Sequence, residues 1–179
     1  MTIVLGVDPG TATTGYGVVA RGGDGAVSLL ECGVIRTAAA RPLPDRLREL
    51  FEGITEVLDR HSPTLMAVEG VFYARNVRTT VVLGHARGAI LLAAALRELP
   101  VVEYSPAEIK NAVVGTGRAT KEQVQYMVQR LLRLRSVPRP SDAADAVAVA
   151  LCHCYAATLP KPPEVMRFTA AMLGKVRGT

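Results

Sequence analysis

Tryptophan is absent from this chain of 179 residues, and aromatic residues make up only 4% of it. Any site that stacks a ligand against rings must therefore use very few side chains. Long apolar runs are also missing: the longest candidate, 88–96, is far shorter than the roughly 18–20 residues of a membrane-spanning helix. The amino-terminal segment has no basic stretch and reaches a carboxylate at Asp8. We therefore expect neither a signal peptide nor a membrane protein.

Cysteine is scarce, with three residues, two of them almost adjacent. This odd count does not suit a disulfide framework and favours a reducing compartment, so we expect a cytoplasmic protein. Cys152-His153-Cys154 invites a zinc interpretation, but ligands this close together on a helix point in different directions and lack the usual zinc spacing. We expect buried thiols there instead. His61 and His85 belong to no recognisable constellation.

Charge is unevenly distributed along the chain. The formal net charge is +5, but residues 1–70 carry a net −3, whereas residues 71–140 hold 11 Lys or Arg against 4 Asp or Glu, a net +7. A basic middle section is typical of a surface that binds a polyanion. An ordinary solubilising surface would have the same composition. The charge therefore becomes informative only if it surrounds a site.

Hydrophobic residues make up 49% of the chain, which is enough for a full core, and their spacing changes along it. Short apolar runs separated by turns come first, as in a hairpin meander, and stretches with a 3.6-residue period then alternate with further short runs. The expected strands are 2–7, 15–20, 27–37, 65–69 and 100–104. The expected helices are 44–61, 79–99, 106–115, 121–132 and 142–158.

This order of elements predicts an α/β protein with three layers, in which helices flank a mixed five-stranded sheet. The sheet begins as an antiparallel meander and continues through βαβ crossovers. We expect one domain over 1–158 and a mobile tail over 159–179, where prolines break regular structure. Ser105 and Thr120 each precede a Glu or Gln by three residues, which predicts two capping boxes, and Ser141 is the expected cap of the last helix.

Four carboxylates stand where the pattern predicts the ends of elements. Asp8 and Glu69 each close an apolar strand, and the carboxyl ends of parallel strands meet at one edge of a sheet, where open α/β folds place their sites. Asp142 and Asp145 are three residues apart and therefore share one face of the last helix. The small residues around them suit a helix that packs closely on the sheet. All four side chains can then meet.

Such a cluster suits hard cations, because Mg²⁺ and Mn²⁺ prefer carboxylate oxygens. Two ions about 3.5–4 Å apart can hold a phosphodiester and activate water. Each acid also has an ordinary explanation: a turn residue at Asp8, a strand-end charge at Glu69, and helix-dipole partners at Asp142 and Asp145. Four coincidences of this kind are much less plausible than one site. With cations bound, the acidic site and the basic middle section are compatible.

Several segments, taken in order, resemble a known family. Gly6–Thr11 followed by Gly15–Val18 is similar to the first hairpin of ribonuclease H-like enzymes. Other segments narrow the resemblance to the RuvC-type Holliday junction resolvases. They are Ala67–Phe72, Ala74–Asn76, Leu83–Gly88, Ile109–Gly115 and Ser141–Ala146. The likeness covers about residues 2–158 in order and register.

The resemblance implies a ribonuclease H-like fold and a metal-dependent endodeoxyribonuclease, with two Mg²⁺ or Mn²⁺ ions per site. Such enzymes resolve four-way DNA junctions by symmetric paired nicks, in recombination and DNA repair. Asp8, Glu69, Asp142 and Asp145 match the family's catalytic, metal-binding acids; some members carry His at the third position, so an all-carboxylate site is expected. Lys121 matches a catalytic lysine that neutralises charge on the phosphate. Without the resemblance, Lys121 would be a solvated residue of a capping box.

DNA contacts are implied as well. The resemblance predicts that Phe72 stacks on or wedges against a base at the junction centre, among neighbouring cations. Ordinary packing of a loop ring and solvated surface charges are the alternative readings. The expected DNA-binding residues are Phe72, Tyr73, Arg75, Asn76, Arg78, Lys110, Arg118 and Lys121.

Partners follow from the same resemblance. It implies a homodimer joined largely through the 79–99 helix, where Gly84 and Gly88 permit close approach; burial of that helix within the monomer is the alternative. A two-fold dimer suits a two-fold-symmetric junction. The resemblance also implies a branch-migration complex, made of a junction-binding tetramer and a ring ATPase, and a bacterial-type location at the nucleoid.

Three other functions are weighed against this one. Actin-like and sugar-kinase ATPases also begin with an Asp-x-Gly-Thr hairpin, but they need a second lobe for which this chain has no room. Another ribonuclease H-like nuclease, acting on RNA–DNA hybrids or in RNA processing, would keep the carboxylates but not the segment 72–78. A non-catalytic junction-binding module would not need acids at all four positions.

Overall fold

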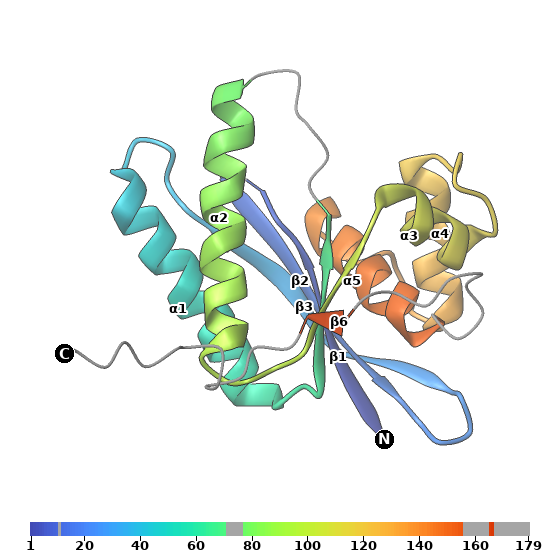
Figure 1. Cartoon of the computed structure of the whole chain (residues 1–179). Helices are drawn as coiled ribbons and strands as arrows, with labels where there is room; N and C mark the ends of the chain where they lie inside the picture. The colour runs from blue at the N-terminus through green and yellow to red at the C-terminus, as the bar shows by residue number, and fades with distance from the viewer. Residues whose placement is uncertain (11, 71–76, 156–164, 167–179) are drawn as a thin grey trace.

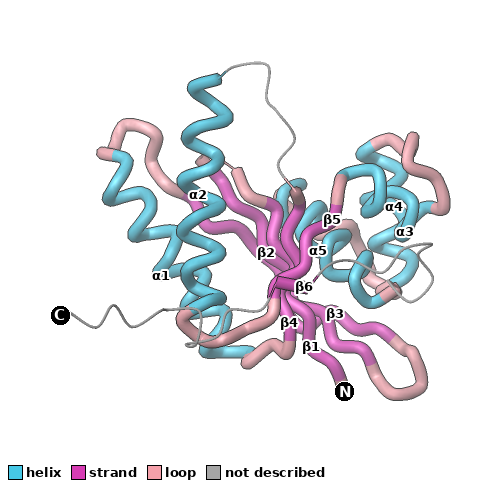
Figure 2. Tube along the Cα trace, in the orientation of Figure 1, coloured by secondary structure: helices cyan, strands magenta, loops and turns pink. Residues whose placement is uncertain are grey.

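A computed structural model describes residues 1–10, 12–70, 77–155 and 165–166, with the side chain of Arg78 left out. It is a three-layer α/β fold in which a six-stranded sheet lies between two groups of helices (Figures 1 and 2). The strands are β1 Thr2–Asp8, β2 Thr13–Arg21, β3 Val27–Arg36, β4 Leu65–Glu69, β5 Val101–Tyr104 and β6 Val165–Met166. The helices are α1 Leu43–His61, α2 Val77–Ala95, α3 Pro106–Val114, α4 Lys121–Leu131 and α5 Ser141–Cys154.

The sheet order is β3-β2-β1-β4-β5-β6. The first three strands form the predicted antiparallel meander, and β4 and β5 add parallel to β1, so the carboxyl ends of β1, β4 and β5 share one edge. The prediction of five strands was wrong by one, because β6 pairs antiparallel with β5. This strand has two residues, too short to leave a periodic signal. The rest of the predicted tail lies outside the described residues.

Apolar side chains fill both faces of the sheet. Helices α1 and α2 cover one face and α3, α4 and α5 cover the other (Figure 1), each with its own buried cluster. The α1–α2 cluster holds Leu5, Val7 and Val68, whereas Val4 and Ala67 belong to the α5 side. Since side chains alternate along a strand, Asp8 and Glu69 point toward the α5 side. Among the described residues, no helix combines the length and apolarity needed to cross a bilayer.

Helix ends agree with the sequence signals at two of three predicted caps. Ser105 and Thr120 form complete capping boxes, with side chains that accept the N–H of Glu108 and Gln123. The prediction for Ser141 was wrong: it is the first residue of α5, and the cap is Pro140, which makes no side-chain hydrogen bond.

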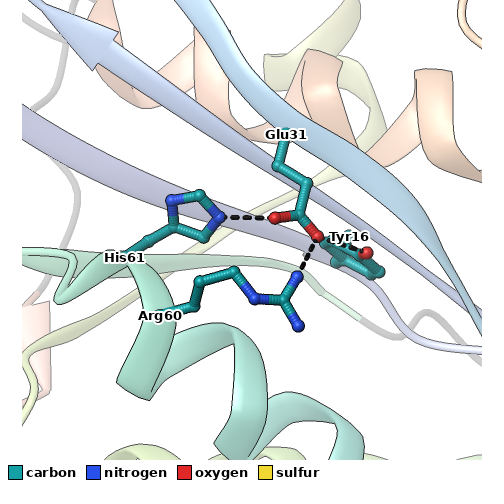
Figure 3. A network of polar contacts seen from close by, with 4 residues as sticks. All are labelled: Tyr16, Glu31, Arg60 and His61. Carbon is teal, nitrogen blue, oxygen red and sulfur yellow. Dashed lines mark hydrogen bonds and ion pairs between the residues drawn. The ribbon is translucent and has the colours of Figure 1, made fainter.

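The end of α1 is bound to the sheet by a polar network that centres on Glu31 (Figure 3). Its Oε1 accepts hydrogen bonds from Tyr16 Oη at 2.8 Å and Arg60 Nη1 at 2.6 Å, and its Oε2 lies 2.6 Å from His61 Nε2. His61, which fits no sequence motif, therefore joins α1 to β3. Its hydrogen bond, with those of Arg60 and Tyr16, lowers the pKa of the Glu31 carboxyl to about 2.

We expect Glu31→Gln to destabilise the fold in a pH-dependent way. Because the pKa of Glu31 is lower in the folded chain than its ordinary 4.5, its ionised form stabilises the fold above pH 4.5, and this contribution disappears between pH 4.5 and 2. With solvent screening of this partly exposed group, the loss at pH 7 is about 1 kcal/mol. Urea denaturation at pH 7 and pH 3 would measure it, with Glu52→Gln, an exposed position on α1, as the control. A difference that stays constant with pH would contradict the assignment.

Candidate active site

Three of the predicted acids meet at the carboxyl edge of the sheet. Asp8 ends β1, and Asp142 and Asp145 lie in the first two turns of α5. One carboxylate oxygen from each lies within 4.8 Å of the other two, and all three side chains are partly buried. The sequence spacing therefore placed both α5 acids on the face that meets the strand ends.

Glu69 lies beside Asp8, on the adjacent parallel strand, and outside the group of three. Val7 is in register with Val68, so the residues that follow them, Asp8 and Glu69, leave the sheet side by side. Their carboxyl groups form a hydrogen bond. Burial raises the pKa of both groups, and repulsion from Glu69 contributes further to raising that of Asp8, to about 8. Two carboxyl groups this close share a proton in the absence of a cation.

The close approach of α5 to the sheet depends on glycine. A Cβ atom on Gly6 would lie 2.2 Å from the carbonyl oxygen of Ala146, and one on Gly15 would lie 2.0 Å from that of Asp142. No side chain fits at either position without moving the helix. Because Gly6 of β1 and Gly15 of β2 have no side chains, α5 can pack close enough to the sheet to bring Asp142 and Asp145 next to Asp8.

Lys121 stands beside the carboxylates. It is the first residue of α4, just after the capping residue Thr120, and its Nζ lies 2.6 Å from Asp145 Oδ2. The hydrogen bond to Asp145 raises the pKa of Lys121, so the amine is firmly charged. A surface pocket between α3, α4 and α5 is lined by Glu69, Lys110, Lys121 and Asp145, among others. Acids and lysines thus face one shared space.

The site is chemically suited to hard divalent cations. Its donors are all carboxylate oxygens, on three separate elements, and their mutual repulsion adds to the effect of burial in raising the pKa of Asp8. A bound cation would remove that repulsion and the shared proton together. The Cys152–Cys154 segment offers no comparable centre: both thiols are buried with raised pKa values, and His153 Nδ1 lies 2.7 Å from Tyr104 Oη.

The predicted DNA-binding residues divide into two groups. Lys110 lines the pocket, and Arg118 is exposed in the loop that precedes α4. Phe72, Tyr73, Arg75 and Asn76 lie outside the described residues. Of Arg78 only the backbone, in α2, is described.

Helix α2 has two apolar faces. Ala86, Ile90 and Ala93 are buried against the sheet. An outer stripe runs along the helix at spacings of three and four residues and is exposed to solvent. It consists of Val77, Val81, Gly84, Gly88 and Leu92. The alternative that α2 is buried entirely within the monomer therefore fails for this stripe.

Sequence reasoning missed one charged pair near the site. Arg87 of α2 forms an ion pair with Glu103 of β5, one strand away from Glu69. The only signal for it was a carboxylate inside a short apolar strand, which indicates no particular partner.

A family profile, curated sequences and solved structures all match this chain to one family. The profile of the family crossover junction endodeoxyribonuclease RuvC matches residues 4–153. Curated members from Pelotomaculum thermopropionicum and Chloroflexus aggregans are 50% and 48% identical, over 86% and 92% of this chain and 93% and 96% of theirs. The structure of Thermus thermophilus RuvC in complex with a Holliday junction substrate superposes with a TM-score of 0.86 at 37% identity, covering 93% of this chain and all of that one. This chain therefore belongs to the crossover junction endodeoxyribonuclease RuvC family, whose members are metal-dependent nucleases.

Proposed function

We propose that this chain resolves four-way DNA junctions by paired, metal-assisted hydrolysis of two phosphodiester bonds. The convergence of Asp8, Glu69, Asp142 and Asp145 at one sheet edge, with Lys121 beside them, is the observation that supports it most. These side chains are the ones that two-metal hydrolysis of a phosphodiester requires.

Asp8, Glu69, Asp142 and Asp145 would hold two Mg²⁺ or Mn²⁺ ions. Bound there, such ions supply charge neutralisation at the phosphate and a water of lowered pKa. The ammonium group of Lys121, at 2.6 Å from Asp145, places a further positive charge where the phosphate would be bound. Lys110, in the same pocket, and Arg118 would hold the backbone on either side of the scissile bond.

DNA contacts at the centre of the junction belong to the segment that joins β4 to α2. We propose that Phe72 stacks on or wedges against a base there, and that Tyr73, Arg75, Asn76 and Arg78 make further DNA contacts. Aromatic rings next to cations suit unpaired bases. The Thermus relative was solved with a Holliday junction, which favours the same substrate here.

A homodimer would present two such sites to one junction. The exposed stripe of α2, with Val81 and Leu92 around Gly84 and Gly88, is suited to packing against its own copy, because glycine lets two helix backbones approach closely. The two-fold axis of such a dimer matches the symmetry of a four-way junction. Family membership also favours cooperation with a junction-binding tetramer and a ring ATPase, on the bacterial nucleoid in the cytoplasm.

Cleavage of end-labelled synthetic junctions tests the proposal. The substrates are a four-way junction, a linear duplex of the same sequence and an RNA–DNA hybrid, each with Mg²⁺, Mn²⁺ or a chelator. We expect symmetric paired nicks in the junction alone, only with metal, leaving ends that a ligase can seal. Cleavage of the hybrid would keep the site but replace the substrate. Tight junction binding without cleavage in either metal would indicate a binding module instead.

A further inference from the structure

The Arg87–Glu103 pair joins α2 to the sheet on the side opposite the carboxylates. Glu103 is in register with Val68, which packs against α1 and α2, whereas Glu69 is in register with Tyr104 on the α5 side. Arg87 Nη2 donates to Glu103 Oε1, and the two side chains are 20% and 35% exposed. The pair is therefore separated from the proposed metal ligands by the sheet itself, so any effect on their position must pass through the backbone.

The backbone path from the Arg87–Glu103 pair to Glu69 is short. Gly70, which follows Glu69, donates its N–H to the carbonyl oxygen of Tyr104 at 2.9 Å. A Cβ atom on Gly70 would lie 4.0 Å from Glu103 Oε2. The pair thus stands directly beside the point where the chain leaves β4, and Arg87 comes from the helix that the chain enters next.

The pair is poorly built for stability alone. Arg87 Nη1 is buried and, within the part of the chain that the structure describes, has no hydrogen-bond partner. An unmatched buried donor is unfavourable, so an apolar side chain of similar length would remove that penalty together with the ion pair. What the planar guanidinium does provide is orientation, because its fork of donors fixes the helix against the carboxylate in one arrangement.

We propose that the Arg87–Glu103 pair is a positioning element for Glu69. By holding α2 and β5 together beside Gly70, it fixes the end of β4 and thereby the placement of the Glu69 carboxylate beside Asp8. Removing it lets this strand end shift, which weakens the hold of the carboxylates on a divalent cation. The inference rests on the proposed function, since cation binding by these acids is part of it.

The test compares Arg87→Met with a matched loss of an ion pair. Arg97→Met is the control, because Arg97 lies just beyond the far end of α2 and donates to Asp59 Oδ1 at 2.6 Å, well away from the carboxylates. We expect R87M to raise the Kd of the DNA-free protein for Mn²⁺ at least five-fold in isothermal titration calorimetry. Its junction cleavage rate at saturating enzyme should fall at least ten-fold, with the junction Kd within two-fold of wild type. R97M should match wild type in all three.

Two milder variants keep the test valid if R87M folds poorly. Arg87→Lys keeps the charge but loses the fork, and Glu103→Gln keeps one acceptor oxygen, so both should lie between wild type and R87M at a temperature where circular dichroism shows them folded. Wild-type Mn²⁺ affinity and cleavage rate in all three variants would overturn the positioning role. Weak junction binding with a normal saturated rate would overturn it too, in favour of a DNA contact. Failure of wild type and R97M to cut junctions would instead overturn the proposed function.

Discussion

Asp145→Asn is expected to abolish most cleavage while leaving junction binding intact. Asparagine keeps the shape of the side chain but removes one of the charges proposed to hold the cations, and it also removes the ionic partner of Lys121. We expect the single-turnover cleavage rate of a four-way junction to fall at least about 1,000-fold, equivalent to about 4 kcal/mol of transition-state stabilisation. Junction binding should stay the same or tighten, because the site becomes less negative toward phosphate.

A neighbouring carboxylate provides the control for this prediction. Glu122 is exposed on α4, next to Lys121, and makes no contact with the acidic cluster in the described structure. Glu122→Gln should therefore cut junctions within about two-fold of wild type, since substitution of an exposed side chain outside the acidic cluster has a small effect. Measuring both variants by gel mobility shift and by quenched-flow cleavage separates binding from chemistry. A D145N enzyme that cleaves at the wild-type rate would remove Asp145 from the site.

The placement of the acids was predictable from the sequence because it depends on regular geometry. A carboxylate at the end of an apolar strand lies at a sheet edge, and parallel neighbours bring two such ends together. The alternation of side chains then turns Asp8 and Glu69 to the same face, and a three-residue spacing aligns Asp142 with Asp145. Each step needs only a periodicity that the sequence displays.

Other features depend on partners distant in sequence and could not be predicted in this way. His61 gains its partner Glu31 only when α1 returns along β3, thirty residues away. The two-residue strand β6 exists only because β5 leaves an edge to which it can pair. Ser141 looks like a helix cap by composition, yet the helix begins one residue earlier than a serine cap would require. Tertiary contacts decide the cases of His61 and β6, and the local sequence pattern does not indicate them.

Gly15→Ala is expected to damage the active site and the fold together. A Cβ atom there would lie 2.0 Å from the carbonyl oxygen of Asp142 and 2.6 Å from its carbonyl carbon, and both are backbone atoms that cannot rotate away. The first turn of α5 must then move off the sheet, and it carries Asp142 and Asp145 with it. Overpacking of this kind destabilises a core by about 1–3 kcal/mol.

The catalytic loss should exceed what the stability loss explains. Because Asp8 stays on β1 while the α5 acids move, even a shift of about 1 Å separates the ligands, and misplacement of that size lowers rates by about 100-fold. Gly23→Ala is the matched control, since a Cβ atom at Gly23 meets nothing within 4 Å. Chemical denaturation and junction cleavage, both at a temperature where each variant is folded, measure the two effects separately. If G15A retained wild-type stability and cleavage, close packing of α5 against Gly15 would not be what brings the acids together.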